Sequence, residues 1–387
     1  MTDTLDPGTD VGLYVHWPYC SRICPYCDFN VVRDRGRGQE QTALAAAILA
    51  DLEAQAALAG PRRLASIFFG GGTPSLMPPE TVAAVLEAAR AWPWANDIEI
   101  TLEANPGSVE RGRFAAYAEA GVNRLSMGVQ ALNDADLRRL GRMHSAAEAR
   151  AAFDIARNAF TRVSFDLIYA RQQQDAASWR RELTEALEMA VDHLSLYQLT
   201  IEPGTAFGAR HAAGRLRDIL DDEIAGDMYL ETQDICEKFG YSAYEVSNHA
   251  RPGAESRHNL TYWRQGDWAA VGPGAHGRLT LPDARVGTEA VRAPGAWLDA
   301  VERLGSGELP REVLPRHDQA VEYLLMSMRL VEGMDRGRFA ALNGAPVDQA
   351  AVQSLVDLGL VEEDGQRIRA TREGRPVLNA ILRELAP

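Results

Sequence analysis

The alternation of short apolar runs with long amphipathic stretches is the feature of this sequence that most restricts its fold. Seven β-like runs lie at residues 13–16, 66–69, 98–102, 124–129, 162–168, 193–199 and 243–246. Between them, apolar residues recur every three or four positions over 41–58, 79–91, 109–120, 145–160, 176–190 and 221–239. Repeated β-then-α units predict an α/β protein with a mostly parallel sheet, as a barrel or a doubly wound sheet. Both architectures place functional residues at the carboxyl ends of the strands.

The length of the chain allows one large domain and a small one. The chain has 387 residues, and we expect a barrel-type domain over residues 1–280. Proline, glycine and charged residues interrupt the periodicity over 281–315, which predicts a linker or domain junction. Residues 316–387 contain helix-like stretches at 316–330, 347–358 and 376–385 and a hairpin signal at Asp364-Gly365. This order is similar to that of a small winged-helix α+β domain.

The charge of the chain argues against polyanionic partners. The formal net charge is −14, and residues 310–387 hold ten arginines against twelve acidic residues. We therefore expect no nucleic-acid binding, even by the winged-helix-like part. No run of eighteen apolar residues occurs, so we expect no transmembrane segment. Low cysteine content without an export signal predicts a cytoplasmic protein.

Three of the four cysteines fall within eight residues, with the spacing C-x3-C-x2-C: Cys20, Cys24 and Cys27. Three thiolates in this pattern can hold three irons of a cubane cluster, which leaves the fourth iron open for a substrate. A zinc site with His16 as a fourth ligand is the alternative. The remaining cysteine, Cys236, lies in a helix-like run and is interpreted as a buried thiol.

Polar and glycine residues follow several of the predicted strands. The turn Gly70–Thr73 would let backbone amides approach a ligand closely, and Glu103, Gln130, Arg142 and Asp166 lie at or after later strand ends. Carboxylates suit the hydroxyls of a ribose, whereas an arginine and an amide suit a carboxylate. Together these groups are suited to an adenosyl amino acid.

These motifs resemble the radical S-adenosylmethionine (SAM) enzymes, and more narrowly their oxygen-independent coproporphyrinogen oxidase branch. The resemblance covers nearly the whole chain and implies a partial (β/α) TIM-like barrel with a [4Fe-4S] cluster on the three clustered cysteines. It also implies SAM on the fourth iron, where reduction cleaves it to methionine and a 5′-deoxyadenosyl radical. The positions that correspond to SAM contacts are Tyr14, Tyr26, Gly71, Gly72, Thr73, Glu103, Gln130, Arg142, Asp166 and Thr200.

Within this branch, the sequence looks more like the heme chaperone HemW family than like the oxidases. Phe29 stands where the oxidases carry a further cysteine, and the nineteen residues before Cys20 are fewer than in the oxidases. The segment His258–Trp263 matches the H-N-x-x-Y-W motif associated with heme binding in that family. The resemblance implies a protein that binds heme and passes it to an acceptor protein, with an electron donor for its cluster. The alternative is a coproporphyrinogen III dehydrogenase that forms protoporphyrinogen IX, and no catalytic residue is assigned. One departure from the family is residues 171–175, which lack its Pro-Gly turn and leave the loop geometry open.

The residues themselves allow more than one heme ligand. The neutral imidazole of His258 could bind heme iron, and Tyr262 and Trp263 could cover a porphyrin face. A histidine that is hydrogen-bonded inside the fold is the alternative. His249 and His276 are rival candidates because both lie beside glycine or proline in turn-like segments.

Overall fold

The computed structural model describes residues 10–36, 38–107 and 111–387, and a twelve-stranded sheet forms most of it. Six strands are parallel and neighbour one another in chain order: β1 (Asp10–Trp17), β4 (Arg63–Gly71), β5 (Trp94–Ala104), β6 (Arg124–Gln130), β7 (Arg162–Tyr169) and β8 (His193–Gln198). The strand β11 (Trp268–Val271) adds in parallel to the other edge of β1. The predicted α/β partial barrel is confirmed.

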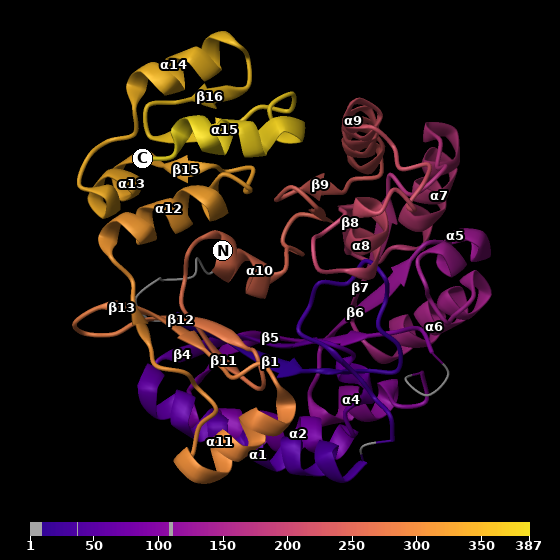
Figure 1. The fold of residues 1–387 in the computed structure, drawn as a ribbon, viewed down its shortest axis with the longest axis vertical. Coiled ribbons are helices and arrows are strands. Elements are labelled where there is room, and N and C mark those ends of the chain that lie inside the picture. Colours follow the sequence, from indigo (N-terminus) through magenta and orange to yellow (C-terminus); the bar gives the residue numbers. More distant parts are fainter. Residues whose placement is uncertain (1–9, 37, 108–110) are drawn as a thin grey trace.

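The helices between the strands cover the outer side of the sheet (Figure 1). They are α1 (Gly38–Ala59), α2 (Pro79–Ala88), α4 (Phe114–Ala120), α5 (Asp134–Arg139), α6 (Ala146–Ala159), α7 (Ala176–Met189) and α9 (Asp222–Lys238). The short helix α8 (Ala206–Ala212) instead contacts the loop after β1, where the Phe207 amide donates to the Pro25 carbonyl at 2.7 Å. Side-chain caps explain where several of these helices begin. Ser145 and Glu148 form a capping box on α6, and Asp175 and Asp221 cap α7 and α9. Residues 109 and 110 of the predicted helix 109–120 lie outside the described residues.

Helix α1 is long and apolar enough to cross a membrane by length and composition. In this structure it packs against β11 and α11 (Pro294–Leu304), and its buried side carries Asp51 and Gln55. The Asp51 carboxylate accepts hydrogen bonds from the Ser306 hydroxyl at 2.7 Å and from the backbone amides of Gly272 and Gly307. These polar contacts hold α1 against the segments that follow β11 and α11.

The stretch 281–315 differs from the predicted linker. It contains β13 (Arg285–Glu289), α11 and β14 (Glu312–Val313), and both strands extend the main sheet beyond β12 (His276–Thr280). Neither strand shows apolar alternation; β13 pairs antiparallel with β12, and β14 pairs antiparallel with β13. The predicted strand 243–246 is shorter, as β9 (Ser242–Ala243), and Glu245 instead turns inward to pair with Arg329.

The loop at residues 171–175 is held by buried charge instead of a Pro-Gly turn. The Arg171 guanidinium lies 2.9 Å from the Asp136 carboxylate, contacts Glu182, and donates to the Ile168 carbonyl at 2.8 Å. Arginine pairs of this kind fix geometry when both partners are buried. These contacts therefore support the loop in the absence of the Pro-Gly turn of the family.

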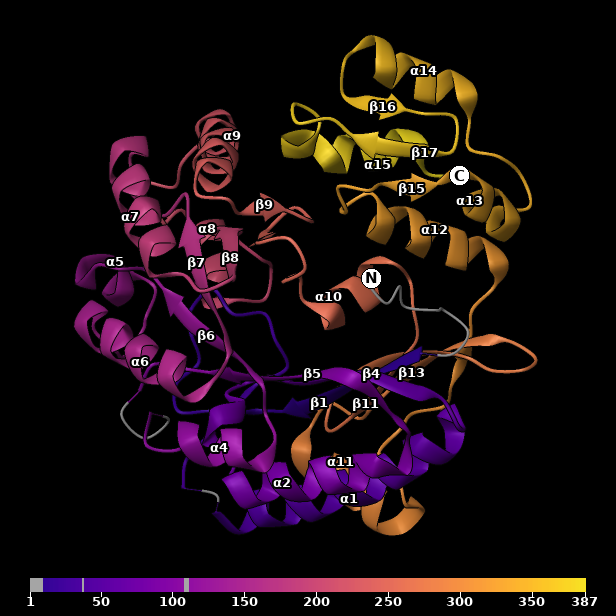
Figure 2. The same ribbon diagram turned by 180° about the vertical axis from the view of Figure 1, so that it is seen from behind.

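The C-terminal part has a hydrophobic core of its own, which includes Phe339 and Ile368. Its elements are α12 (Arg316–Ser327), β15 (Met334–Asp335), α13 (Arg336–Asn343), α14 (Gln349–Asp357), β16 (Val361–Glu363), β17 (Arg367–Ala370) and α15 (Leu378–Leu385). The hairpin predicted at Asp364-Gly365 is confirmed as β16 and β17. Figure 2 shows this part on the side of α10 (Arg257–Trp263), across the sheet from α1 and α2.

Candidate functional site

The three clustered cysteines lie in a loop between β1 and α1, at the carboxyl end of β1. The short strands β2 (Tyr19–Cys20) and β3 (Val32–Arg33) pair in parallel and close the base of the loop. The Cys27 amide donates to the Cys24 carbonyl at 3.1 Å, which forms a turn between these two thiols. All three cysteines are free thiols and line one cavity of about 130 Å³.

The glycine-rich turn after β4 holds the cysteine loop. The Thr73 amide donates to the Tyr19 carbonyl at 2.8 Å, and the Thr73 hydroxyl lies 3.5 Å from the Cys20 sulfur. A Cβ on Gly72 would lie 2.7 Å from the Tyr19 oxygen, and Gly71 has a φ of +106°. Glycine is therefore needed here because two backbone segments approach too closely for a side chain.

Arg142 follows α5 and reaches back into the cysteine cavity. Its guanidinium lies 3.5 Å from the Cys24 sulfur and donates to the Gly128 carbonyl at 2.6 Å and to the Asn105 side chain. Asn105 in turn donates to the Thr73 hydroxyl at 3.0 Å. Asn105 is a site residue that the sequence analysis did not select, although it lies in the turn directly after Glu103.

Two carboxylates face the same cavity from β5 and β7. Burial and the neighbouring Asp166 charge raise the pKa of Glu103 to about 8. Burial raises the pKa of Asp166 to about 6, against the lowering effect of a hydrogen bond from Ser195. Gln130 ends β6 between them in a left-handed conformation, with φ at +73°. Carboxylates in this setting favour a ligand that brings hydroxyl donors or positive charge.

The structure brings most of the predicted SAM residues together with the three thiols. The residues that line the cysteine cavity are Tyr26, Gly71, Gly72, Thr73, Glu103, Gln130, Arg142 and Asp166. Tyr14 lines an adjoining cavity of about 750 Å³, which shares Phe29, Gly71 and Glu103 with the first. Thr200 is exposed after β8 and lies outside the lining of both cavities.

His16 does not complete a zinc site with the cysteines. Its Nδ1 lies 3.0 Å from the Tyr14 hydroxyl and its Nε2 lies 2.9 Å from the Asn30 carbonyl, so both ring nitrogens are engaged. Within the described ranges, no three His, Cys, Asp or Glu side chains are grouped to hold a single metal ion. Thiolates that each bind a different iron of one cluster need no such grouping, and the open cavity between them fits that use.

His258 is a core residue in this structure. It lies in the first turn of α10, stacks on Phe68 with ring centroids 5.0 Å apart, and has a pKa lowered to about 3 by burial. Its Nδ1 lies 2.9 Å from the Ser66 hydroxyl, and its Nε2 contacts the Tyr262 hydroxyl. The prediction that His258 binds heme iron does not fit this arrangement, because both ring nitrogens are engaged and the residue lines neither of the two cavities described above.

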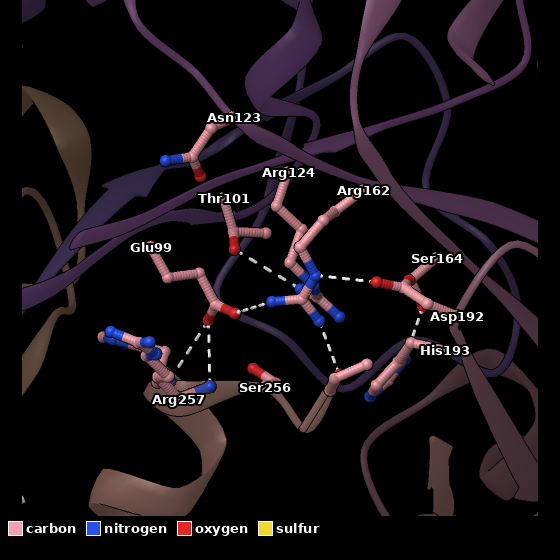
Figure 3. Close-up of polar contacts among 12 residues, drawn as sticks. Glu99, Thr101, Asn123, Arg124, Arg162, Ser164, Asp192, His193, Ser256 and Arg257 are labelled. Atoms are coloured by element: carbon pink, nitrogen blue, oxygen red, sulfur yellow. Dashed lines mark hydrogen bonds and ion pairs between the residues drawn. The ribbon is translucent and has the colours of Figure 1, made fainter. Parts of the chain in front are cut away.

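A charged cluster fixes α10 inside the barrel, toward the amino ends of the strands (Figure 3). The Glu99 carboxylate accepts from the Arg257 amide at 3.0 Å and from the Arg162 guanidinium at 2.8 Å. Arg162 also lies 2.8 Å from Asp192. The first turn of α10 is thus held by a buried carboxylate at its positive end.

The two rival histidines differ in accessibility. His249 is buried in β10 (Asn248–Ala250) and its Nε2 lies 3.0 Å from the Gln233 side chain. His276 begins β12, is exposed, and lines the larger cavity. Cys236 is buried in α9, as predicted.

Comparisons with known proteins agree with this architecture. The radical SAM superfamily model matches residues 14–176, and the HemN C-terminal domain model matches residues 314–377. The structure of coproporphyrinogen III oxidase (HemN) from Escherichia coli aligns with a TM-score of 0.82 over 99% of this chain and 91% of that chain, at 23% identity. That likeness concerns the fold.

Curated relatives extend the match to the whole sequence. The chain is 40% identical to radical S-adenosyl methionine domain-containing protein 1, mitochondrial, of Bos taurus, over 98% of this chain and 88% of that protein. It is 36% identical to the heme chaperone HemW of Haemophilus influenzae and 37% identical to that of Escherichia coli, each over 96% of this chain and 97% of the relative. The chain therefore belongs to the radical SAM superfamily, within the family of HemN and the heme chaperone HemW.

Proposed function

We propose that this protein is a heme chaperone that carries a [4Fe-4S] cluster, binds SAM, and transfers heme to an acceptor protein. The observation that carries the proposal is Phe29. This residue is 63% exposed and lines both the cysteine cavity and the larger cavity beside it. An apolar ring at this junction offers surface to a porphyrin, where the oxidase pattern has a cysteine. The 36–37% identity to proteins named heme chaperone HemW, over 96% of this chain, supports the same function.

The residues present fit the cluster and SAM. Cys20, Cys24 and Cys27 would hold three irons, and the cluster with SAM would supply one-electron and radical chemistry. The Arg142 guanidinium lies 3.5 Å from the Cys24 sulfur and would place a positive charge beside the bound cluster. Glu103 would accept hydrogen bonds from hydroxyl groups or offset the positive charge of SAM.

Loading of the site should release protons. Burial raises the pKa of the Cys20 thiol and raises that of Cys27 to about 11, so both are protonated near neutral pH without a metal. Cluster binding requires thiolates and is therefore coupled to proton release. We place the protein in the cytoplasm because three free thiols beside one another stay reduced only in a reducing compartment. An electron donor and a heme acceptor complete its partners.

Two assays on anaerobically reconstituted protein test the proposal. Titration with hemin should give a saturable Soret shift. Incubation with SAM, a reductant and coproporphyrinogen, followed by chromatography, should yield no protoporphyrinogen. A Cys24→Ser variant serves as the control that lacks a complete cluster. Appearance of protoporphyrinogen in the intact protein alone would replace the chaperone function with the oxidase function, and absence of hemin binding would refute it.

A further inference from the structure

The cavity beside the cysteine site has the size and lining of a small-molecule pocket. Its volume of about 750 Å³ falls within the range of roughly 300–1,000 Å³ that is usual for such pockets. It lies between the carboxyl end of β1, helix α10 and the start of β12, with α12 beside it. Five of the fourteen residues that line it are aromatic: Tyr14, Phe29, Tyr262, Trp263 and Trp268. Flat rings on several sides suit a flat, largely apolar ligand.

Only one histidine on these walls has a ring free for a ligand. Of the eight histidines in the chain, His16 and His276 line the cavity, and both nitrogens of His16 are engaged. The His276 side chain is 49% exposed, and no described residue hydrogen-bonds to its ring. Glu289 lies directly opposite on β13, with 3.7 Å between the His276 Nε2 atom and the carboxylate oxygen. A carboxylate at this position can orient an imidazole that binds a metal.

The backbone before His276 is fixed against the cysteine loop. The Asn30 amide donates to the Pro273 carbonyl at 2.9 Å and to the Arg292 carbonyl at 3.0 Å. Gly274 has a φ of +76°, and a Cβ there would lie 2.2 Å from the Asn30 side chain. The turn that presents His276 therefore has little freedom to move. Rigid support of this kind favours metal coordination because less ordering is needed on binding.

The rim of the cavity carries a cation. The Arg292 side chain is 72% exposed, lines the cavity, and lies 3.4 Å from Glu289. An exposed guanidinium can exchange a surface partner for a ligand carboxylate at little cost. Heme presents an apolar face, an iron with an axial position and two carboxylates. The cavity offers aromatic rings for the apolar face, His276 for the iron and Arg292 for a carboxylate.

We propose that this cavity holds the heme and that His276 is its axial iron ligand. This inference rests on the proposed function and deepens it. Tyr262 and Trp263 of the H-N-x-x-Y-W segment contribute walls, whereas His258 of the same segment stays in the core. Arg292 binds a heme carboxylate at the rim. The heme then lies directly beside the cavity of the cysteines, since Phe29, Gly71 and Glu103 line both.

Hemin titration of single-site variants tests the assignment. His276→Ala should lower hemin affinity by about tenfold or more and remove the imidazole signature from the absorption and EPR spectra of the complex, and added imidazole should restore the signature. His276→Gln should behave in the same way and guards against a local folding defect. The matched control is His317→Ala, which removes an exposed histidine from α12 and should leave affinity and spectrum unchanged.

The possible results separate this inference from the proposed function. If the intact protein binds no hemin, the proposed function itself fails, and the inference fails with it. If it binds hemin and His276→Ala keeps the affinity and spectrum of the intact protein, only the ligand assignment is overturned. A loss of affinity with the imidazole signature retained would also overturn it, since His276 would then only shape the cavity.

Discussion

Adding one methyl group at Gly72 should loosen the cluster without unfolding the protein. A Cβ at this position would lie 2.7 Å from the Tyr19 carbonyl oxygen and 2.8 Å from the carbonyl carbon and oxygen of Pro18. All three are backbone atoms, so no side chain can rotate away. The Tyr19 oxygen would have to move by about 0.7 Å to restore an ordinary contact, and overpacking of this kind costs about 1–3 kcal/mol.

The cost should fall mainly on the cluster-loaded state. Cys20 directly follows the displaced segment, so the empty loop can relax outward, whereas a bound cluster would pin the thiol in place. A strain of about 2 kcal/mol borne by the loaded state lowers cluster affinity about thirtyfold. We therefore expect Gly72→Ala to lose iron to a chelator much faster than the unmodified protein.

Iron and acid-labile sulfide per chain, measured before and during the chelator challenge, provide the readout. Gly295→Ala is the matched control, because a methyl group on that glycine of α11 would meet no described atom within 4 Å and the residue has no positive φ. It should load and hold iron normally. Equal iron content and equal chelator resistance in Gly72→Ala, at unchanged melting temperature, would refute the argument that the glycine turn clamps the cysteine loop.

Three further predictions follow from the site and its support. Glu103 keeps its proton up to about pH 8 in the folded protein but releases it near pH 4.5 in the unfolded chain. Between these two pH values the native state binds more protons than the unfolded state, so its stability falls as pH rises. The melting temperature of the cofactor-free protein should therefore decrease as pH rises from 5 to 9. Glu103→Gln should flatten that slope in a thermal-shift series, and an unchanged slope would contradict the assignment. Glu99→Gln should lower the free energy of unfolding by about 2–4 kcal/mol, because Arg162 loses a buried charge partner; a change below about 0.5 kcal/mol in chemical denaturation would count against the role given to this pair. Asn30→Ala should weaken hemin binding in the same titration as His276→Ala, by about 1–2 kcal/mol for the lost support of the turn, and unaltered binding would show that the turn holds its shape alone.

Much of the barrel and the cysteine site could be predicted because each depends on local periodicity and strand order. Once the β-then-α units are recognised, Glu103, Gln130 and Asp166 must approach one another, since parallel strands end at the same edge. The strands β13 and β14 could not be predicted in this way. Their residues show no apolar alternation, and their places in the sheet depend on the antiparallel pairing of β13 with β12 and of β14 with β13.

Contacts between distant segments were also beyond the sequence. Asn105 and Asn30 are ordinary turn residues by composition, and only the fold places one between Arg142 and Thr73 and the other against the turn before His276. Thr200 matches a position of the family pattern, but its side chain is exposed in this structure, so its contact with SAM stays a prediction.

The two histidines show why a motif alone does not identify a ligand. Helical spacing puts His258 and Tyr262 on one face of α10, and that face packs on the inner side of the sheet. Gly12 on β1 makes room for the ring, since a Cβ there would lie 3.3 Å from the His258 Nδ1 atom, and Ser66 beside it occupies that nitrogen. A larger residue at position 12 would displace the His258 ring, whereas glycine leaves room for the ring in the core. His276 instead starts a strand after a turn with two positive-φ glycines, and its ring keeps both nitrogens free of hydrogen bonds from the described residues. An axial ligand needs a free nitrogen at a cavity wall. Since His258 is buried with both nitrogens engaged, these contacts favour His276 over the histidine of the motif.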